Sequence, residues 1–381
     1  MSAKIKTIQI VYFEAASGHL SAAKAIEAAL KQANSEWNVS CVDVIDLLQH
    51  HTVFQKIVTA GIHYFNFLLT REALSDLPGL IRLSVFVQGQ VRASGHKKIA
   101  RFWENKAPDI LISVTPMYNE VMFRSLKQAN PTAKYITIPV DFEESRERYW
   151  FTPSCEDILY LNAKEKLMKQ AKQAGISDKR SVRIGGMVIT PEYYDYAENT
   201  DEREKKLVEM GLNPAWPVVT VSYGGQGSVI VKKIARQIQK YTQEINVIFL
   251  CGKNESVFDW LISQQFTYKK AVLGYQKETP VRYIQLSDVV IGKPGAMTIT
   301  ENMISKKPSL LIKSTGLHFV QQCNEQWVEE KQVGIVLKKM KDLPEKLHEL
   351  LTNPVYKQQC ELEFHKGIFD VAEEIVDRTK V

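Results

Sequence analysis

The segment Ser287–Lys313 combines residue types that suit a bound phosphate and ribose. Its short apolar run Val289–Ile291 predicts a buried parallel strand, and the glycines and proline of Gly292–Gly295 predict a tight turn after it. A helix expected from about Met297 to Ser305 would present free N–H groups and a positive dipole end to an anion. Glu301 could accept hydrogen bonds from two vicinal ribose hydroxyls, or it could simply complement the helix dipole. Spacing alone does not separate these two interpretations.

A second glycine-rich loop, Ser222–Ser228, lies between an expected strand and a helix that we expect to begin near Val229. Backbone amides of such a loop can form a cradle for a pyrophosphate. It is not a Walker loop, because no Gly-Lys-Ser/Thr follows. The sequence also lacks an Asp-x-Asp triplet that would hold Mg²⁺ against a diphosphate. A bound sugar nucleotide would therefore depend on amides and helix dipoles.

His19 follows the first expected strand and a loop over residues 14–18, at the start of an Ala-rich helix. Gly18 permits a tight turn there. A histidine at a helix N-terminus can act as a general base near neutral pH. It can equally cap the helix or stabilise the loop, and a single histidine does not distinguish these roles.

Strands and helices alternate in two series, which predicts an α/β protein with two Rossmann-like parallel-sheet domains facing a central cleft. We place the domains at residues 1–190 and 191–381, with the last helix able to pack back on the first domain. The boundary region holds three prolines and a charged run. The strands expected in the first series are Lys6–Phe13, Trp37–Val44, Asp109–Val114, Ala133–Val140, Asp157–Leu161 and Val182–Ile184, and those in the second are Val218–Ser222, Val247–Cys251, Val289–Ile291 and Ser309–Ile312.

Composition indicates a soluble globular protein: 381 residues, 45% hydrophobic, 24% charged, with a net charge of +6. The five cysteines are scattered and odd in number, which predicts reduced thiols in a cytosolic protein and argues against a disulfide framework or zinc site. We expect no signal peptide, and no apolar stretch reaches 18 residues.

One region could contact a membrane. Ile57–Leu69 is an apolar run that fits a buried core helix or an interfacial one. Between His51 and Ala100, six basic residues stand against two acidic ones. That excess could face anionic lipid or nucleic acid, or be a solvated helix face. Nucleic acid is disfavoured because aromatic residues do not interleave with the basic ones.

Taken together, these motifs resemble the family-28 glycosyltransferases of the GT-B fold, and within them the branch of monogalactosyldiacylglycerol synthases and processive diacylglycerol glucosyltransferases. The similar segments run in the same order over most of the chain. In the first half they are Ser17–Ala23, Pro108–Val114 and Ile138–Phe142, and in the second half Tyr223–Gly227, Leu250–Asn254, Gly274–Tyr275, Lys293–Glu301 and Gln321–Asn324.

The resemblance implies an acceptor-binding first domain, a donor-binding second domain, and inverting, metal-independent transfer of a hexose from a UDP-sugar to a lipid, with diacylglycerol as the expected acceptor. The UDP-sugar is a substrate, and no cofactor is expected. The enzyme would be cytoplasmic and peripheral, on the inner face of an anionic membrane. The implied residues are His19 and Asp141 for catalysis; Ser17 and Gly18 in the acceptor loop; Gly225, Gln226, Gly227, Ser228, Gly295, Ala296 and Met297 for the diphosphate; Tyr275 beside the base; Glu301 for the ribose; and Gln321, Gln322 and Asn324 for the hexose.

The chain departs from the family pattern on the acceptor side. The family's three glycines before the histidine are Ala16, Ser17 and Gly18 here, the preceding acidic residue is Glu14, and a His-Pro-x-Trp segment is replaced by Arg146–Trp150. Two alternatives therefore stay open. One is a glycosyltransferase for another lipid or a small aglycone, and the other is a catalytically weak UDP-sugar-binding regulatory protein. The hexose, the number of sugars added and the oligomeric state are not specified by these motifs.

Overall fold

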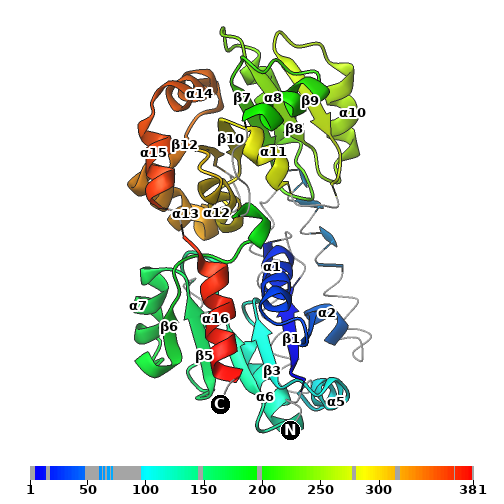
Figure 1. Cartoon of the computed structure of the whole chain (residues 1–381), viewed down its shortest axis with the longest axis vertical. Coiled ribbons are helices and arrows are strands. Elements are labelled where there is room, and N and C mark those ends of the chain that lie inside the picture. The colour runs from blue at the N-terminus through cyan, green and yellow to red at the C-terminus, as the bar shows by residue number, and fades with distance from the viewer. Residues whose placement is uncertain are drawn as a thin grey trace. The chain divides into compact units, whose positions relative to one another are not determined.

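The computed structural model describes residues 5–13, 18–47, 60–61, 63–64, 67–68, 70–71, 96–144, 149–194, 200–276, 280–313, 318–363 and 365–379. The chain divides into two compact units, each of α/β type (Figure 1). Unit 1 consists of Met1–Phe65, Asp76–Pro191 and His365–Val381, and unit 2 of Asn66–Ser75 and Glu192–Phe364. Unit 2 therefore includes a short segment from the first part of the chain.

Unit 1 is built on a parallel six-stranded sheet in the order β2-β1-β3-β4-β5-β6. Its central strands are runs of Ile, Leu and Val buried at nearly every position, as a sheet covered on both faces requires. Each strand overlaps one predicted from the sequence. The strands are β1 (Thr7–Tyr12), β2 (Asn38–Asp43), β3 (Ile110–Ser113), β4 (Lys134–Thr137), β5 (Ile158–Asn162) and β6 (Ser181–Arg183).

The helix α1 (Gly18–Ala33) buries a face made largely of alanine, which lets it lie close to its neighbours. The last helix, α16 (Gly367–Thr379), contacts α1 within unit 1. A Cβ on Gly367 would stand 1.9 Å from the carbonyl oxygen of Gly186, so only glycine fits this approach. The other helices of unit 1 are α2 (Val44–Leu47), α5 (His96–Lys106), α6 (Asn119–Ala129), α7 (Glu165–Gln173) and the 3-10 turn η2 (Asp178–Arg180).

Unit 2 has a second parallel six-stranded sheet, in the order β12-β11-β10-β7-β8-β9. The prediction of two parallel-sheet domains is thus confirmed. The two edge strands, β9 and β12, were not predicted; β9 begins with two lysines, so its sequence lacks the continuous apolar run of a buried strand. The strands are β7 (Val218–Ser222), β8 (Asn246–Leu250), β9 (Lys269–Leu273), β10 (Val289–Gly292), β11 (Ser309–Ile312) and β12 (Gly334–Leu337).

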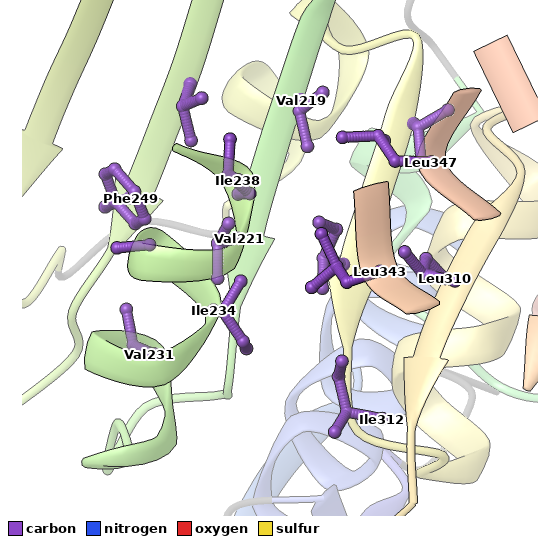
Figure 2. Packing of buried hydrophobic residues seen from close by; sticks show 14 of the residues in the cluster. Val219, Val221, Val231, Ile234, Ile238, Phe249, Leu310, Ile312, Leu343 and Leu347 are labelled. Carbon is purple, nitrogen blue, oxygen red and sulfur yellow. The ribbon is translucent and has the colours of Figure 1, made fainter. Parts of the chain in front are cut away.

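The core of unit 2 follows the twofold alternation of strand side chains. Val219 and Val221 point to one face, where Ile234 of α9 and Leu343 of α14 pack (Figure 2). Val218, from the same strand, belongs to a separate cluster on the other face. The helices of unit 2 are α8 (Thr200–Glu209), α9 (Ile230–Ile238), α10 (Glu255–Ser263), α11 (Val281–Leu286), α12 (Ala296–Ile304), α13 (His318–Lys331), α14 (Leu343–Thr352), α15 (Val355–Leu362) and the 3-10 turns η3 (Pro191–Tyr193) and η4 (Met340–Asp342).

The apolar run Ile57–Leu69 is described only in part. Its residues 60–61, 63–64 and 67–68 are helical, with Leu68 buried and Tyr64 and Phe67 exposed. Most of the basic stretch up to Lys98 lies outside the described residues. Among the helices that the structure describes, none combines the length and hydropathy needed to cross a bilayer.

Candidate active site

His19 stands at the start of α1 with one ring nitrogen already engaged. Its Nδ1 lies 2.7 Å from the carbonyl oxygen of Val114, just past the end of β3. A carbonyl oxygen can only accept, so Nδ1 carries the hydrogen, and the neutral ring keeps its lone pair on Nε2. The side chain is half-buried, as is Gly18 before it, whereas Ser17 lies outside the described residues. This tautomer is the one that a general base at Nε2 requires.

Asp141, shortly after β4, is connected to His19 through an aromatic side chain. Its Oδ2 accepts a hydrogen bond of 3.0 Å from the indole Nε1 of Trp150. The Trp150 and His19 ring centroids are 6.0 Å apart. Burial raises the pKa of Asp141, while the charge of His19 and the Trp150 hydrogen bond offset part of that rise. Asp141 thus lies where its charge interacts with the ring of His19.

The backbone that carries Trp150 is held by a buried carboxylate, Glu144. Its two oxygens accept from the backbone N–H groups of Tyr149, Trp150 and Phe151, at 2.8, 2.6 and 3.0 Å. Asn119 also donates to the carbonyl oxygen of Trp150, at 3.2 Å. Neither Glu144 nor Trp150 was among the residues predicted for the site. The sequence gives no spacing signal for them, since the contacts between Glu144 and these backbone N–H groups form only in the folded protein.

In unit 2, the glycine-rich loop after β7 interlocks with the loop after β8. Gly227 has φ +68°, and a Cβ on it would stand 2.1 Å from the carbonyl oxygen of Cys251. Gly252 has φ +57°, and its Cβ would stand 2.5 Å from the carbonyl oxygen of Gly225. The N–H of Lys253 donates to that same oxygen at 2.9 Å. Two segments predicted separately, Tyr223–Gly227 and Leu250–Asn254, therefore form one piece of backbone.

The amide that follows this loop is already engaged. The N–H of Val229 donates to the carbonyl oxygen of Thr70 at 2.9 Å, so the segment Asn66–Ser75 contributes to the start of α9. An anion bound by this loop would depend on amides earlier in it.

A third loop precedes α12 and lies beside the glycine-rich loop that follows β7. Gly295 is the N-cap of α12, has extended backbone and places no side chain over the helix N-terminus. The side chain of Lys293 lies close to both loops, with its Nζ 3.8 Å from a Cβ built on Gly224 and its Cε 3.9 Å from one built on Gly295. The N-terminus of α12 and the ammonium group of Lys293 thus lie close together in unit 2.

Glu301 lies near the middle of α12, where the dipole of the helix N-terminus has largely decayed. The structure therefore gives little support to its interpretation as a dipole-complementing carboxylate. Burial raises the pKa of Glu301 to about 7, although Tyr193 and Lys293 act to lower it. Tyr193 is itself buried, in η3. A carboxyl group in this setting titrates near neutral pH.

Comparison with known proteins identifies the family. Residues 218–369 match the glycosyltransferase family 28 C-terminal domain, and residues 19–189 match the monogalactosyldiacylglycerol (MGDG) synthase family. The chain thus carries a family-28 glycosyltransferase C-terminal domain, preceded by a domain that matches the MGDG synthase family. The prediction from the sequence motifs is confirmed at this level.

Among the relatives of this glycosyltransferase is the chloroplastic monogalactosyldiacylglycerol synthase of Spinacia oleracea, 25% identical over 356 residues, or 89% of this chain and 65% of the relative. The processive diacylglycerol beta-glucosyltransferase of Bacillus subtilis is 23% identical over 68% of this chain and 65% of its own length. The chain thus spans a little under two thirds of each of these proteins. The fold is similar to that of MurG from Acinetobacter baumannii, with a TM-score of 0.58 at 10% identity and coverage of 98% and 99%. The predicted GT-B fold is confirmed.

The remaining predicted donor residues of this glycosyltransferase lie in different settings. Tyr275 is 52% exposed, with the Nζ of Lys253 5.1 Å from its ring centroid. On α13, Gln321 is buried and its Oε1 has no hydrogen-bond partner among the described residues, whereas Gln322 is exposed. Asn324 is buried and donates from Nδ2 to the carbonyl oxygen of Pro294 at 2.9 Å. Its amide therefore braces the turn before α12, a task that the sequence did not suggest.

Over the part of the glycosyltransferase that the structure describes, no three His, Cys, Asp or Glu side chains are grouped closely enough to hold a metal ion.

Proposed function

We propose that this glycosyltransferase moves a hexose from a UDP-sugar to a hydroxyl group of diacylglycerol, with inversion at the sugar carbon and without a metal. The observation that carries the proposal is the hydrogen bond from His19 Nδ1 to the carbonyl oxygen of Val114, which leaves the ring's lone pair on Nε2, together with the charge interaction between His19 and Asp141. The relatives are a monogalactosyldiacylglycerol synthase and a processive diacylglycerol beta-glucosyltransferase, which supports the choice of acceptor.

On the acceptor side, the lone pair of His19 Nε2 would take the proton of the lipid hydroxyl as its oxygen attacks the anomeric carbon. The bond from that carbon to the diphosphate breaks, and UDP leaves with the electron pair. Attack from the opposite face inverts the anomeric centre. The hydrogen bond to Val114 fixes the ring, and the negative charge of Asp141 would stabilise the imidazolium that forms.

On the donor side, amides of residues 225–228 and 295–297 would hold the diphosphate where negative charge develops, although the N–H groups of Gly227 and Gly295 already donate to the carbonyl oxygens of Gly224 and Lys293 at 3.0 and 2.8 Å. Glu301 would accept the ribose hydroxyls, and the exposed ring of Tyr275 would lie beside the base. Gln321, a buried acceptor, and its neighbour Gln322 would contact the hexose. Asn324 would act through the Pro294 turn.

The proposed location is the cytoplasmic face of an anionic membrane, with the protein peripheral to it. In unit 2, Phe67 is 47% exposed, and the guanidinium carbon of Arg71 lies 4.5 Å from its ring centroid. An exposed aromatic ring paired with a cation suits the interfacial region of an anionic bilayer.

Transfer assays on vesicles test the proposal. The purified chain is incubated with vesicles of diacylglycerol and anionic phospholipid and with labelled UDP-glucose, UDP-galactose or UDP-N-acetylglucosamine, with and without EDTA. We expect one UDP-hexose to give a new glycolipid on thin-layer plates, at a rate that EDTA does not change, with the inverted anomer by NMR. UDP binding by calorimetry without transfer to any lipid would instead favour the regulatory alternative.

A further inference from the structure

We propose that Lys293 is the cation that binds the diphosphate of the donor, a role that rests on the proposed use of a UDP-sugar. Lys293 directly follows β10, between Gly292 and Pro294. It is half-buried, so its ammonium group is held near the protein surface rather than fully solvated.

The position of its side chain relative to two glycines is the first observation. The distances from Lys293 to a Cβ on Gly224 and on Gly295, 3.8 and 3.9 Å, are ordinary contact distances. Since both residues are glycines, neither adds a side chain of its own between its backbone and Lys293. A phosphate lying against those loops would lie against Lys293 as well.

The charge around Lys293 is the second observation. Its positive charge lowers the pKa of Glu301, so the two groups interact in the protein without ligand. An ammonium group has three donors. It can therefore bind phosphate oxygens on one side while Glu301, still flanked by Tyr193, accepts the ribose hydroxyls. Ligand binding would replace part of the Lys293–Glu301 attraction by a stronger one to the diphosphate.

The size of the dipole effect is the third argument. A helix N-terminus is equivalent to about half a positive charge. A diphosphate carries more than one negative charge, and that charge grows as UDP departs. Amides and the α12 dipole alone would leave part of it without a counter-charge, which a full cation at this position supplies. Lys293 should therefore matter for binding the diphosphate and for its departure.

Calorimetry with uridine and UDP separates this role from general damage to the site. At about pH 8.5, where Glu301 is largely ionised even though its pKa rises without Lys293, we expect UDP to bind Lys293→Met about 10–100-fold more weakly. At this pH uridine affinity should stay within about twofold, and Lys293→Arg should recover part of the loss. The matched control is Lys240→Met, which removes an exposed charge just past the C-terminal end of α9. Thermal unfolding of each variant checks that it is folded.

The outcomes are distinct. Equal losses for uridine and UDP, or unchanged UDP affinity in Lys293→Met, would overturn the assignment of Lys293 while leaving UDP-sugar use intact. A wild-type chain that binds neither uridine nor UDP would refute the proposed function and the Lys293 role together.

Discussion

Trp150 contacts both groups of the proposed base. Its indole donates to Asp141 at 3.0 Å, and its ring lies 6.0 Å from that of His19, centroid to centroid. Because Glu144 holds the backbone of Trp150 with short hydrogen bonds, the indole has little freedom to move away. The segment Tyr149–Phe151 thus places the indole of Trp150 next to both residues of the proposed base.

Removing the indole N–H should change the pH dependence of transfer. The Trp150 hydrogen bond favours the ionised form of Asp141, so Trp150→Phe should raise the pKa of Asp141 further. Transfer needs ionised Asp141. With a higher pKa, Asp141 stays protonated up to a higher pH, so the acid limb of kcat/KM should move to higher pH. Profiles measured between about pH 5 and 9 show the shift. In Asp141→Asn the contribution of Asp141 to this limb should disappear, leaving only the loss of activity that protonation of the base His19 causes. Identical wild-type and Trp150→Phe profiles would contradict the prediction.

His19 should affect chemistry and not donor binding. In His19→Ala, the lipid hydroxyl loses its proton acceptor, and kcat should fall by about 10²–10⁴-fold. UDP affinity, measured by calorimetry, should not change. His348→Ala, which removes an exposed histidine on α14, is the matched control and should keep full activity. A His19→Ala variant with normal turnover would instead support the regulatory alternative.

Much of the fold could be predicted because parallel strands leave a strong sequence signal. Val218–Ser222 and Ser309–Ile312 were predicted with the bounds observed, since a strand buried on both faces must be continuously apolar. Edge strands carry no such requirement. Lys269–Leu273 is partly exposed and starts with two lysines, so its pairing with β8 could not be deduced from its residues.

The site was predictable where backbone geometry demands glycine, and less so where side chains meet through folding. The two glycine loops were identified from sequence, and the positive φ of Gly227 and Gly252 explains why glycine stands there. By contrast, the hydrogen bond from Asn324 to Pro294 joins segments whose proximity no sequence spacing reveals. The same holds for the hydrogen bonds that Glu144 accepts from backbone N–H groups. Lys293 was visible as part of a motif, but its position against Gly224 required the structure.

Two glycine substitutions should separate stability from binding. In Gly227→Ala, the new Cβ meets a backbone oxygen at 2.1 Å and the residue must keep φ +68°. The free energy of unfolding should therefore fall by about 1–3 kcal/mol. That corresponds to a fall in melting temperature of several degrees. In Gly295→Ala the nearest atoms are at 3.8 Å and φ is −82°, so the melting temperature should hold. If the diphosphate approaches that backbone, Gly295→Ala should still weaken the binding of UDP but not the binding of uridine. Equal melting temperatures for the two variants would contradict the strain argument.

Ribose binding should depend on pH through Glu301. Only an ionised carboxylate can accept both vicinal hydroxyls, and burial raises the pKa of Glu301 to about 7. The binding-competent fraction therefore increases as pH rises through 7, and affinity should increase about tenfold between pH 6 and pH 8. Uridine is the appropriate ligand, because it lacks the phosphate groups that titrate in the same range. In Glu301→Gln we expect weaker uridine binding that no longer changes with pH. In Tyr193→Phe the increase in uridine affinity should be steeper between these pH values and shifted to higher pH, since Tyr193 favours the ionised carboxylate. Calorimetry across this range decides the matter, and a wild-type affinity that stays flat would remove Glu301 from ribose recognition.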